Sequence, residues 1–404
     1  MEEKKSLVRV FVKGGILSPD TFLEILTTAK SLGAEFIHLG SRQDLLFSAK
    51  DKSKDILDQA FSSIQVQHEV NAFTHQNIVS SYVALDVMAS KKWLNQYLYK
   101  HILDQFDFSA KYRINLVDPS QSLVPLFTGN INFIASDIDN YWYVYLRFKQ
   151  FENIPFVYGK LVHSDDLSSL AKVLNDLDRV TNEPEEFWHK QMDNLDIETR
   201  SIDEPLKYPQ PAFPYYEGLN RESGGNYWLG LYWRNNKFSI NFLIALCERS
   251  IETHVHTISL TPWKSLIIKG IEEKFLVGWE KLMGRYGINL RHSSLELNWH
   301  LPLLSEESLQ LKNYLVRALD QQDISTSGLT FTVKPNDDIY LFTSVVIEMN
   351  TEGEDGNRTY NILYAKDFNP NSATYLTYVK NVTQSVLPAL LMELSVMYFD
   401  QIED

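Results

Sequence analysis

The stretch VRVFVKGGILSPDTFLEILTTAKSLGAEFIHLGSRQDLLF, residues 8–47, decides the fold, because a second copy of its pattern runs from Tyr232 to Ile268. Matching Ile37 to Ile258 sets the offset between the copies at 221 residues, and at this offset the two copies align without a gap. Each copy predicts a strand, a turn, a helix that follows a serine, and a second strand that ends in a polar turn and an apolar run. A unit repeated about half a chain apart predicts a pseudo-symmetric protein, with a shared site where the copies meet.

Local signals within the first copy define its elements. Residues 7–12 suit a strand, and Ser18-Pro19 places a capping side chain and a proline at the start of a helix. Gly33 is placed to end that helix. A strand is expected at 35–39 and a second helix at 51–61. This order favours an α+β fold, with an antiparallel sheet covered by helices on one face.

The rest of the chain predicts further strands and helices. Helices are expected at 92–106, 167–177, 185–192, 270–286 and 305–319, and strands at 112–117, 131–135, 141–148, 329–333, 341–348 and 360–365. A long C-terminal helix is expected from Ala373 to Tyr398. Between residues 205 and 218, prolines alternate with aromatic residues and predict an extended linker that lies against the protein.

Composition excludes several classes of protein. The chain has 404 residues, 44% of them hydrophobic, and a formal net charge of −14, which argues against nucleic-acid binding and against docking on anionic lipid. Cys247 is the only cysteine, so this chain alone builds neither a disulfide framework nor a cysteine-ligated cluster. No targeting or membrane segment is visible, and we expect a cytoplasmic protein without nucleic-acid or membrane partners.

The motifs resemble those of a known family, the sulfite and nitrite reductases that carry sirohaem beside an iron–sulfur cluster. Residues 14–19, GGILSP, and 39–43, LGSRQ, resemble its first ferredoxin-like half-domain, whose usual ending is Leu-Thr-Thr-Arg-Gln. Residues 258–263, ISLTPW, are similar to the second half-domain. Segments 77–79, 111–114 and 132–135 resemble the central sirohaem-binding domain.

The resemblance implies an α+β fold with tandem ferredoxin-like half-domains, related by pseudo-twofold symmetry, and two larger α+β domains of sulfite/nitrite-reductase type. The implied boundaries are a first half-domain at 1–70, a central domain at 71–204, the proline and aromatic linker at 205–218, a second half-domain at 219–290 and a C-terminal domain at 291–404.

In that family, two arginines and two lysines form a basic pocket that holds the anionic substrate on one face of the sirohaem. Carried over by position, Arg42 matches the first arginine, and Lys111 with Arg113 matches a Lys-x-Lys pair. Gln76 stands where a second arginine is usual, and a guanidinium at 113 is a poor proton donor. The residues expected to line an anion- or tetrapyrrole-binding pocket are Arg42, Gln43, Gln76, Lys111, Arg113, Trp263 and Lys264. The alternatives are structural: a surface arginine, a solvated strand face, and a tryptophan that fills an interface.

The cluster motif is absent. The family uses Cys-x5-Cys and Cys-x3-Cys to hold a [4Fe–4S] cube, and these positions fall at Leu295, Leu301, Lys334 and Asp338. His254 and His256, two positions apart on an expected strand, are a weak metal pattern without a nearby third ligand, and we expect no metal site.

Three hypotheses follow. The first is an oxidoreductase component that binds an anion or a tetrapyrrole such as sirohaem and receives electrons from a partner, for example a rubredoxin-type module. The second is a non-catalytic descendant of the scaffold that binds a ligand or a protein. The third, a reductase working with sirohaem alone, fits least because both the axial thiolate and the cluster are missing.

Overall fold

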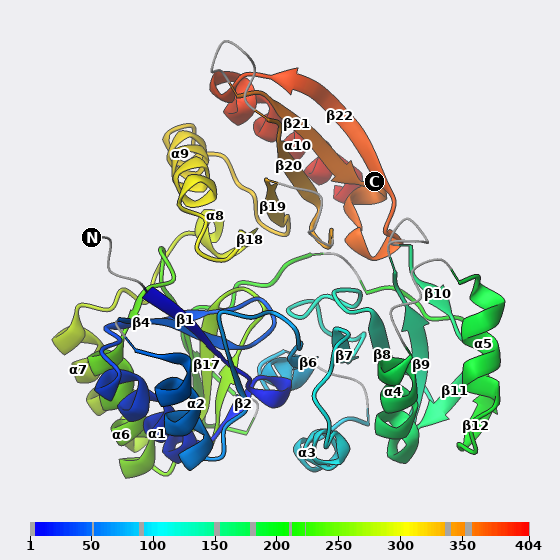
Figure 1. The fold of residues 1–404 in the computed structure, drawn as a ribbon. Coiled ribbons are helices and arrows are strands. Elements are labelled where there is room, and N and C mark those ends of the chain that lie inside the picture. Colours follow the sequence, from blue (N-terminus) through cyan, green and yellow to red (C-terminus); the bar gives the residue numbers. More distant parts are fainter. Residues whose placement is uncertain are drawn as a thin grey trace.

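The computed structural model describes residues 5–50, 52–88, 93–148, 154–177, 183–209, 212–222, 224–335, 341–351 and 358–403. These residues form four sheets: two of five strands from the repeated units, one of seven strands, and a further one of five strands near the C-terminus. The repeated units and the seven-stranded sheet make a broad lower body, and the C-terminal sheet stands above it (Figure 1). This arrangement confirms the predicted α+β fold class.

The first repeated unit forms an antiparallel sheet backed by two helices. Its strands are β1 (Lys5–Val10), β3 (Phe36–Leu39), β4 (Leu45–Lys50) and β5 (His68–Val70). Helix α1 (Pro19–Ser31) begins as the sequence predicts, because the Ser18 hydroxyl accepts the Thr21 N–H at 3.0 Å. Gly33 follows its end with φ of +85°, in the left-handed region. Helix α2 spans Lys54–Ser63.

The second unit repeats the first. Its strands are β13 (Gly218–Arg221), β14 (Tyr227–Tyr232), β16 (Ile258–Leu260) and β17 (Ser265–Ile271), and its helices are α6 (Ile240–Glu252) and α7 (Leu276–Tyr286). The first and last residues of α6 are the counterparts of the first and last residues of α1, so the offset found in the sequence holds at both ends of the helix.

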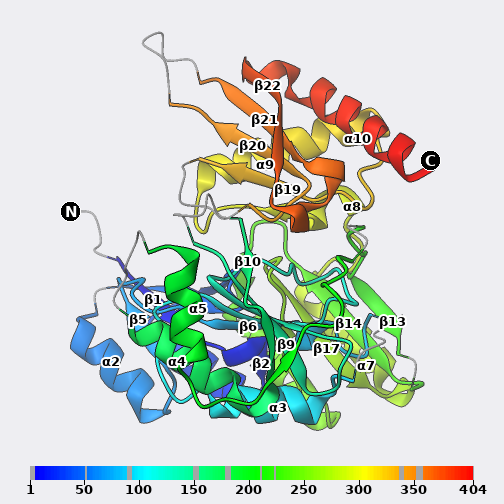
Figure 2. The ribbon, with the colours of Figure 1, turned by 90° about the vertical axis from the view of Figure 1, so that its right-hand side faces the viewer.

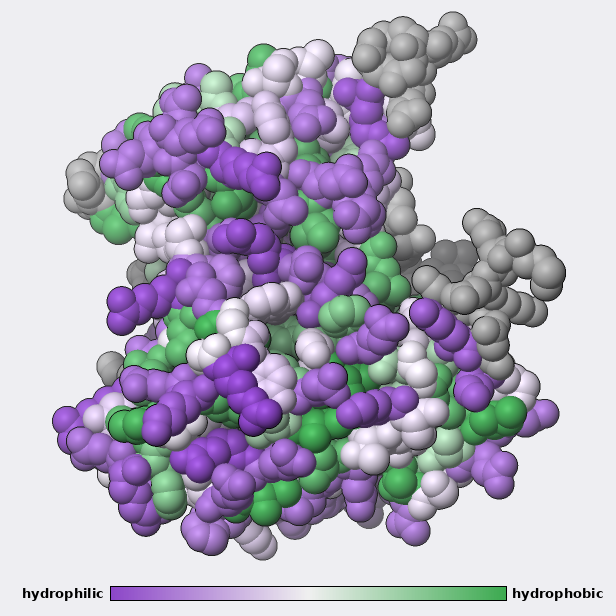
Figure 3. Space-filling model, turned by 90° about the vertical axis from the view of Figure 1, so that its left-hand side faces the viewer, coloured by the Kyte–Doolittle hydropathy of each residue, from purple (hydrophilic) through white to green (hydrophobic). Residues whose placement is uncertain are grey.

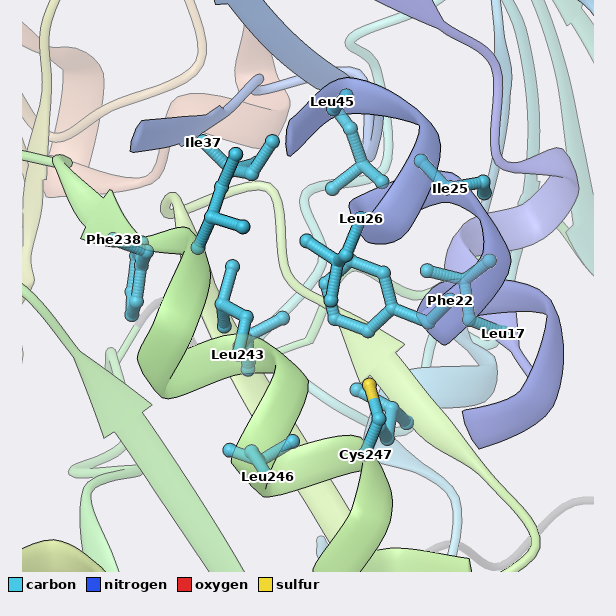
Figure 4. Close-up of a cluster of buried hydrophobic side chains, with 14 of the residues drawn as sticks. Leu17, Phe22, Ile25, Leu26, Ile37, Leu45, Phe238, Leu243, Leu246 and Cys247 are labelled. Atoms are coloured by element: carbon cyan, nitrogen blue, oxygen red, sulfur yellow. The ribbon is translucent and has the colours of Figure 1, made fainter. Parts of the chain in front are cut away.

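The two units exchange a short strand each. β2 (Ile16–Leu17) pairs with β16 of the second sheet, and β15 (Phe238–Ser239) pairs with β3 of the first. The registers Leu17 to Ile258 and Phe238 to Ile37 are equivalent under the offset. Between them, α1 packs against α6 in one hydrophobic core, where the Cys247 thiol of α6 points towards α1 (Figure 4).

The two larger sheets share a pattern that the sequence did not reveal. In the seven-stranded sheet, β6 (Ile78–Ser80), β7 (Ile114–Val117) and β8 (Ile131–Ala135) are parallel and β9 (Tyr141–Leu146) is antiparallel. In the C-terminal sheet, β18 (Trp299–His300), β19 (Phe331–Lys334) and β20 (Val345–Met349) are parallel and β21 (Tyr360–Ala365) is antiparallel. The first residues of β6 and β18 are related by the same offset, so the duplication extends to these sheets. The remaining elements are β10 (Phe156–Val157), β11 (Lys160–His163), β12 (Thr199–Ser201), α3 (Gln96–Gln105), α4 (Leu167–Asp176), α5 (Glu185–Asp193), α8 (Ser294–Leu297) and α9 (Glu306–Gln321).

Three sequence expectations are wrong. The C-terminal helix is preceded by an eight-residue edge strand, β22 (Tyr375–Val382), and α10 runs from Leu387 to Glu403, because residues 375–382 pair with β21. The strand expected at 112–117 begins only at Ile114, as β7, so Lys111 and Arg113 both precede it and do not share a strand face. His254 has φ of +56° in a turn that precedes β16, so it is not on a strand with His256.

Two further features are the linker at 205–218 and the boundary between the lower body and the C-terminal sheet. Tyr216 is fully buried and its hydroxyl donates to the Leu297 carbonyl at 3.0 Å, so this end of the linker lies against the protein, whereas Tyr208 and Tyr215 are exposed; residues 210 and 211 of the linker lie outside the described residues. The C-terminal part sits above the body when the molecule is turned (Figure 2), and mainly hydrophilic residues follow the waist between the two on the face shown in Figure 3. Among the helices of the described residues, none has the length and apolar composition that crossing a bilayer requires.

Candidate functional site

Arg42 connects the first repeated unit to the seven-stranded sheet. Its side chain is 9% exposed, and its guanidinium donates to the Asn115 Oδ1 at 2.7 Å, the Asn77 carbonyl at 2.8 Å and the Ile114 carbonyl at 2.9 Å. A guanidinium offers five N–H donors in a planar fork, and here the two terminal nitrogens face protein acceptors. The structure therefore places Arg42 as a clamp between the turn after β3 and strand β7.

Gln43 joins three parts of the chain. It is fully buried with φ of +57°, and its Nε2 donates to the Ser80 carbonyl at 2.9 Å and to the Leu260 carbonyl at 2.8 Å. The Ser80 N–H donates back to its Oε1 at 2.9 Å. Gly15 leaves room for this side chain, since a Cβ there would stand 2.6 Å from Gln43 Cδ. Gln43 is thus a fixed link between the two units and β6.

The other polar residues expected to line the pocket with Arg42 are spread apart. Lys111 is exposed, and its backbone N–H donates to Asn175 Oδ1 at 2.6 Å. Arg113 is partly buried and its charge helps to lower the pKa of His300. Gln76 lines a cavity of about 320 Å³ between Phe11 and the segment 108–110. The structure does not gather these three residues and Arg42 around one of the cavities described here.

Aromatic side chains fill the junction where the two units meet the larger sheets. Trp263 is 3% exposed, and its indole N–H donates to the Leu123 carbonyl at 2.7 Å. Its ring lies 4.5 Å from that of Phe213 and 5.9 Å from that of Phe342, which in turn lies 4.6 Å from His300. The cavity beside this cluster is only about 30 Å³, so the aromatic side chains leave little open space at the junction.

These residues do not fit sirohaem with a [4Fe–4S] cluster. Leu295 and Leu301 are apolar, and Lys334 forms an ion pair with Glu348 at 2.8 Å; Asp337 and Asp338 lie outside the described residues. The Cys247 thiol is buried between α1 and α6, and burial raises its pKa, so it supplies no thiolate (Figure 4). Within the described residues, no group of three or more His, Cys, Asp or Glu side chains is arranged to hold a metal.

A basic cavity of about 260 Å³ lies on the other side of Trp263. We use the name basic cavity for the space lined by the turn after β14, the turn between β16 and β17, and the segment from Trp299 to the middle of α9. Its lining residues are His38, Tyr232, Trp233, Arg234, Asn235, Asn236, Lys237, Trp263, Lys264, Trp299, Leu301, Pro302, Leu304, Ser305, Glu306, Leu309 and Lys312. Of the predicted site residues, Trp263 and Lys264 line it.

The cations of the basic cavity oppose one another. Burial and, less strongly, Lys312 lower the pKa of Lys264 to about 8, against the opposing effect of Asp44. The pKa of His38 is lowered by burial and by Lys237 and Lys264. The positive charges of these side chains therefore repel one another, and a bound anion would reduce this repulsion.

Lys312 and Arg234 share one carboxylate. The Lys312 Nζ lies 2.6 Å from Glu296 Oε2 and donates to the Tyr232 hydroxyl at 2.9 Å, while Arg234 Nε lies 2.7 Å from Glu296 Oε1. Glu296 therefore balances one of these two charges. The first turn of α9 also borders the cavity, where Ser305 caps the helix and Glu306 adds a second carboxylate. The positive charges lining the cavity still outnumber the negative ones.

Lys264 stands at the position that Gln43 occupies in the first unit. The offset between the units maps one onto the other, both have positive φ, +57° and +58°, and both donate to a carbonyl at equivalent positions, Ser80 and Leu301. An amide therefore satisfies this structural position in one copy, and an ammonium occupies it in the other. Sequence analysis missed Arg234, Lys237 and Lys312; for Arg234 the offset, which maps Lys13 onto it, was an available signal.

Comparisons with known proteins support the fold. No protein family and no curated protein matches the sequence. Among solved structures, the chain is similar to the NirA protein of Mycobacterium tuberculosis, with a TM-score of 0.71 and 14% identity over 97% of this chain and 80% of NirA. The chain therefore has the fold of NirA, with the tandem half-domains and two larger α+β parts of the sulfite/nitrite-reductase architecture.

Proposed function

We propose that this chain is an anion-binding protein, a member of the reductase scaffold that has lost the cluster and binds a small anion in the basic cavity without redox chemistry of its own. The observation that carries the proposal is the convergence of His38, Arg234, Lys237, Lys264 and Lys312 on one cavity of about 260 Å³. The chain as a whole carries a net charge of −14, so a local excess of cations is not an average property of its surface.

The energetic cost of this cluster supports a functional role. Burial of Lys264 and Lys312 disfavours their charged forms, and structure alone has no need of the charge at 264, where Gln43 serves in the other copy. Titratable groups whose pKa values are shifted by burial and by neighbouring charges are found most often at functional sites. We therefore expect the bound anion to repay part of this cost.

The tetrapyrrole hypothesis receives less support. A macrocycle needs a pocket towards the upper end of the usual range for ligands, about 300 to 1,000 Å³. Trp263 and Phe342 occupy the junction, and the guanidinium of Arg42 faces protein acceptors. An electron-delivering partner of rubredoxin type stays a prediction of the sequence, and anion binding does not require it.

The test is calorimetric titration of the purified chain with sodium sulfate, sodium nitrite and sodium acetate at low ionic strength. We expect binding by at least one anion, weakened roughly 5- to 30-fold by Arg234→Ala or Lys237→Ala, since a charge-assisted contact contributes about 1 to 2 kcal/mol when it is partly exposed. The exposed Lys281, on α7 outside the cavity, gives the matched control Lys281→Ala, which should bind as the wild type does. Binding that none of the cavity variants alters would contradict the proposal, as would a Soret absorption band that stays with the chain after added sirohaem has been separated from it by gel filtration.

A further inference from the structure

The side chain of Lys264 lines the basic cavity from a fixed backbone. The turn that carries it is closed by the Thr261 N–H, which donates to the Ser265 carbonyl at 3.0 Å, and by the Trp263 N–H, which donates to Thr261 Oγ1 at 3.1 Å. Its neighbours Trp263 and Ser265 are buried. A nucleophile on such a turn is held in place before a ligand arrives.

The amine has few partners. Among the described residues, the Leu301 carbonyl, 2.6 Å from Nζ, is the hydrogen-bond acceptor found for it. The charged and titratable groups around it are Lys312, His38 and His300, which carry or can take positive charge, and Asp44, which is already 2.5 Å from Arg9. Lys264 thus lacks the carboxylate that holds a proton on Lys312.

The free amine of a lysine, rather than its ammonium form, attacks carbonyl carbon. With its pKa at about 8, roughly a tenth of Lys264 is neutral at pH 7, compared with about 0.03% of a lysine at the ordinary value. Burial beside other cations is a known way to activate such a lysine.

We infer that Lys264 is a nucleophilic amine that forms an imine with a carbonyl compound bearing an anionic group, such as a 2-oxo acid or an aldehyde acid. This inference rests on the proposed function, because the cations of the basic cavity would bind the anionic group. The Nζ lone pair attacks the carbonyl carbon, both hydrogens of the neutral amine pass as protons to the carbonyl oxygen, and that oxygen leaves as water while the carbon–nitrogen double bond forms; no oxidant or reductant is needed. The imine is reversible, and cyanoborohydride traps it by delivering a hydride to the imine carbon.

The chain offers a matched internal control. Lys269 also has its pKa lowered by burial to about 8, but its Nζ donates to the Tyr82 and Leu85 carbonyls, each at 3.0 Å, and lies over the Tyr82 ring. It does not line the basic cavity. A lowered pKa alone should therefore not make Lys269 reactive.

The experiment is labelling of the full chain with glyoxylate and cyanoborohydride at pH 7, with peptide mass spectrometry to follow each lysine. We expect Lys264 to be labelled at least about tenfold faster than Lys281, because its neutral fraction is larger, and faster than Lys269, because only Lys264 lines the cavity that would bind the anionic group. Acetaldehyde, which lacks the anionic group, should show a smaller preference for Lys264, and sulfate should slow the glyoxylate reaction at Lys264 alone. Lys264→Gln introduces the side-chain amide that Gln43 supplies at the equivalent position. It should therefore remove the fast labelling site and keep the fold.

The outcomes separate the two proposals. Glyoxylate labelling of Lys264 no faster than that of Lys281, in a chain that still binds sulfate, would overturn the imine inference and leave the proposed function standing. Equal preference for acetaldehyde and glyoxylate would overturn the anionic class of the substrate. A chain that binds no anion and labels no lysine selectively would overturn both.

Discussion

Replacing Arg42 by alanine should destabilise the fold rather than remove a ligand contact. The three shortest hydrogen bonds recorded for its guanidinium, 2.7 to 2.9 Å long, reach Asn115, Asn77 and Ile114, and the side chain is 9% exposed. Truncation leaves buried acceptors without their donors, at about 1 to 3 kcal/mol each. Since some of these acceptors keep a second partner, we expect a total loss of about 3 to 6 kcal/mol.

Thermal unfolding followed by circular dichroism measures this loss. At about 2.1 cal/mol/K per residue, the unfolding entropy of 404 residues is about 0.85 kcal/mol/K, so Tm should fall by about 4 to 7 °C if the chain unfolds as one unit. Lys111→Ala is the matched control, because that side chain is exposed and a surface change alters stability by less than about 0.5 kcal/mol.

Anion titration of the same variants decides between the two roles of Arg42. The clamp predicts a lower Tm with sulfate affinity unchanged. A Tm equal to that of Lys111→Ala together with weakened anion binding would refute it, and would restore Arg42 to a ligand pocket. Arg42→Lys keeps the charge and loses the planar fork, so its Tm should lie between those of the alanine variant and the wild type.

Three further predictions concern stability. Lys264→Gln should stabilise the chain by up to about 3 kcal/mol near pH 7, because a folded pKa of about 8 lies below the unfolded value of about 10.5; the gain should fade between pH 8 and 10.5, as urea titrations at pH 7 and 10 would show. Burial lowers the pKa of His300 to about 3, so below pH 6.5 the unfolded chain takes up a proton that the folded chain refuses; His300→Phe should therefore lose less stability than the wild type between pH 6.5 and pH 4. Gly15→Ala should cost about 1 to 3 kcal/mol, since φ is +69° and the new Cβ would meet Gln43, whereas Gly284→Ala, in open space on a helix, should stabilise slightly in the same melts.

The repeat predicted the fold where local signals decide it. Ser18 and Gly33 mark the ends of α1, and the offset carried those ends to α6 without error. The exchange of β2 and β15 was not predictable, because such short strands have no period and their partners lie in the opposite half of the chain. The edge strand β22 was missed for a different reason: its tyrosines, threonine and valines are typical of a strand, but the expected C-terminal helix was extended back over them.

The candidate site was predicted only where the repeat pointed to it. Trp263 stands opposite Arg42 in the duplication, and its neighbour Lys264 was named with it. Arg234 and Lys312 were missed because they come from separate elements and meet only when the C-terminal part packs against the second unit. The sequence also could not show that the Arg42 guanidinium donates to main-chain carbonyls. Every residue has a main-chain carbonyl, so such an acceptor leaves no mark in the sequence.

The comparison of Gln43 with Lys264 separates structure from function within one molecule. Both side chains link their turn to an equivalent carbonyl, so the link explains why a hydrogen-bond donor is present at each position. It does not explain a charge at 264, because the amide at 43 makes the same link at lower cost in a buried place. If the charge serves only the link, Lys264→Gln should raise stability and leave sulfate binding and glyoxylate labelling of the chain unaltered. If it serves a ligand, the same change should raise stability, weaken sulfate binding and remove the fast glyoxylate labelling, which is the trade expected of a residue retained for binding.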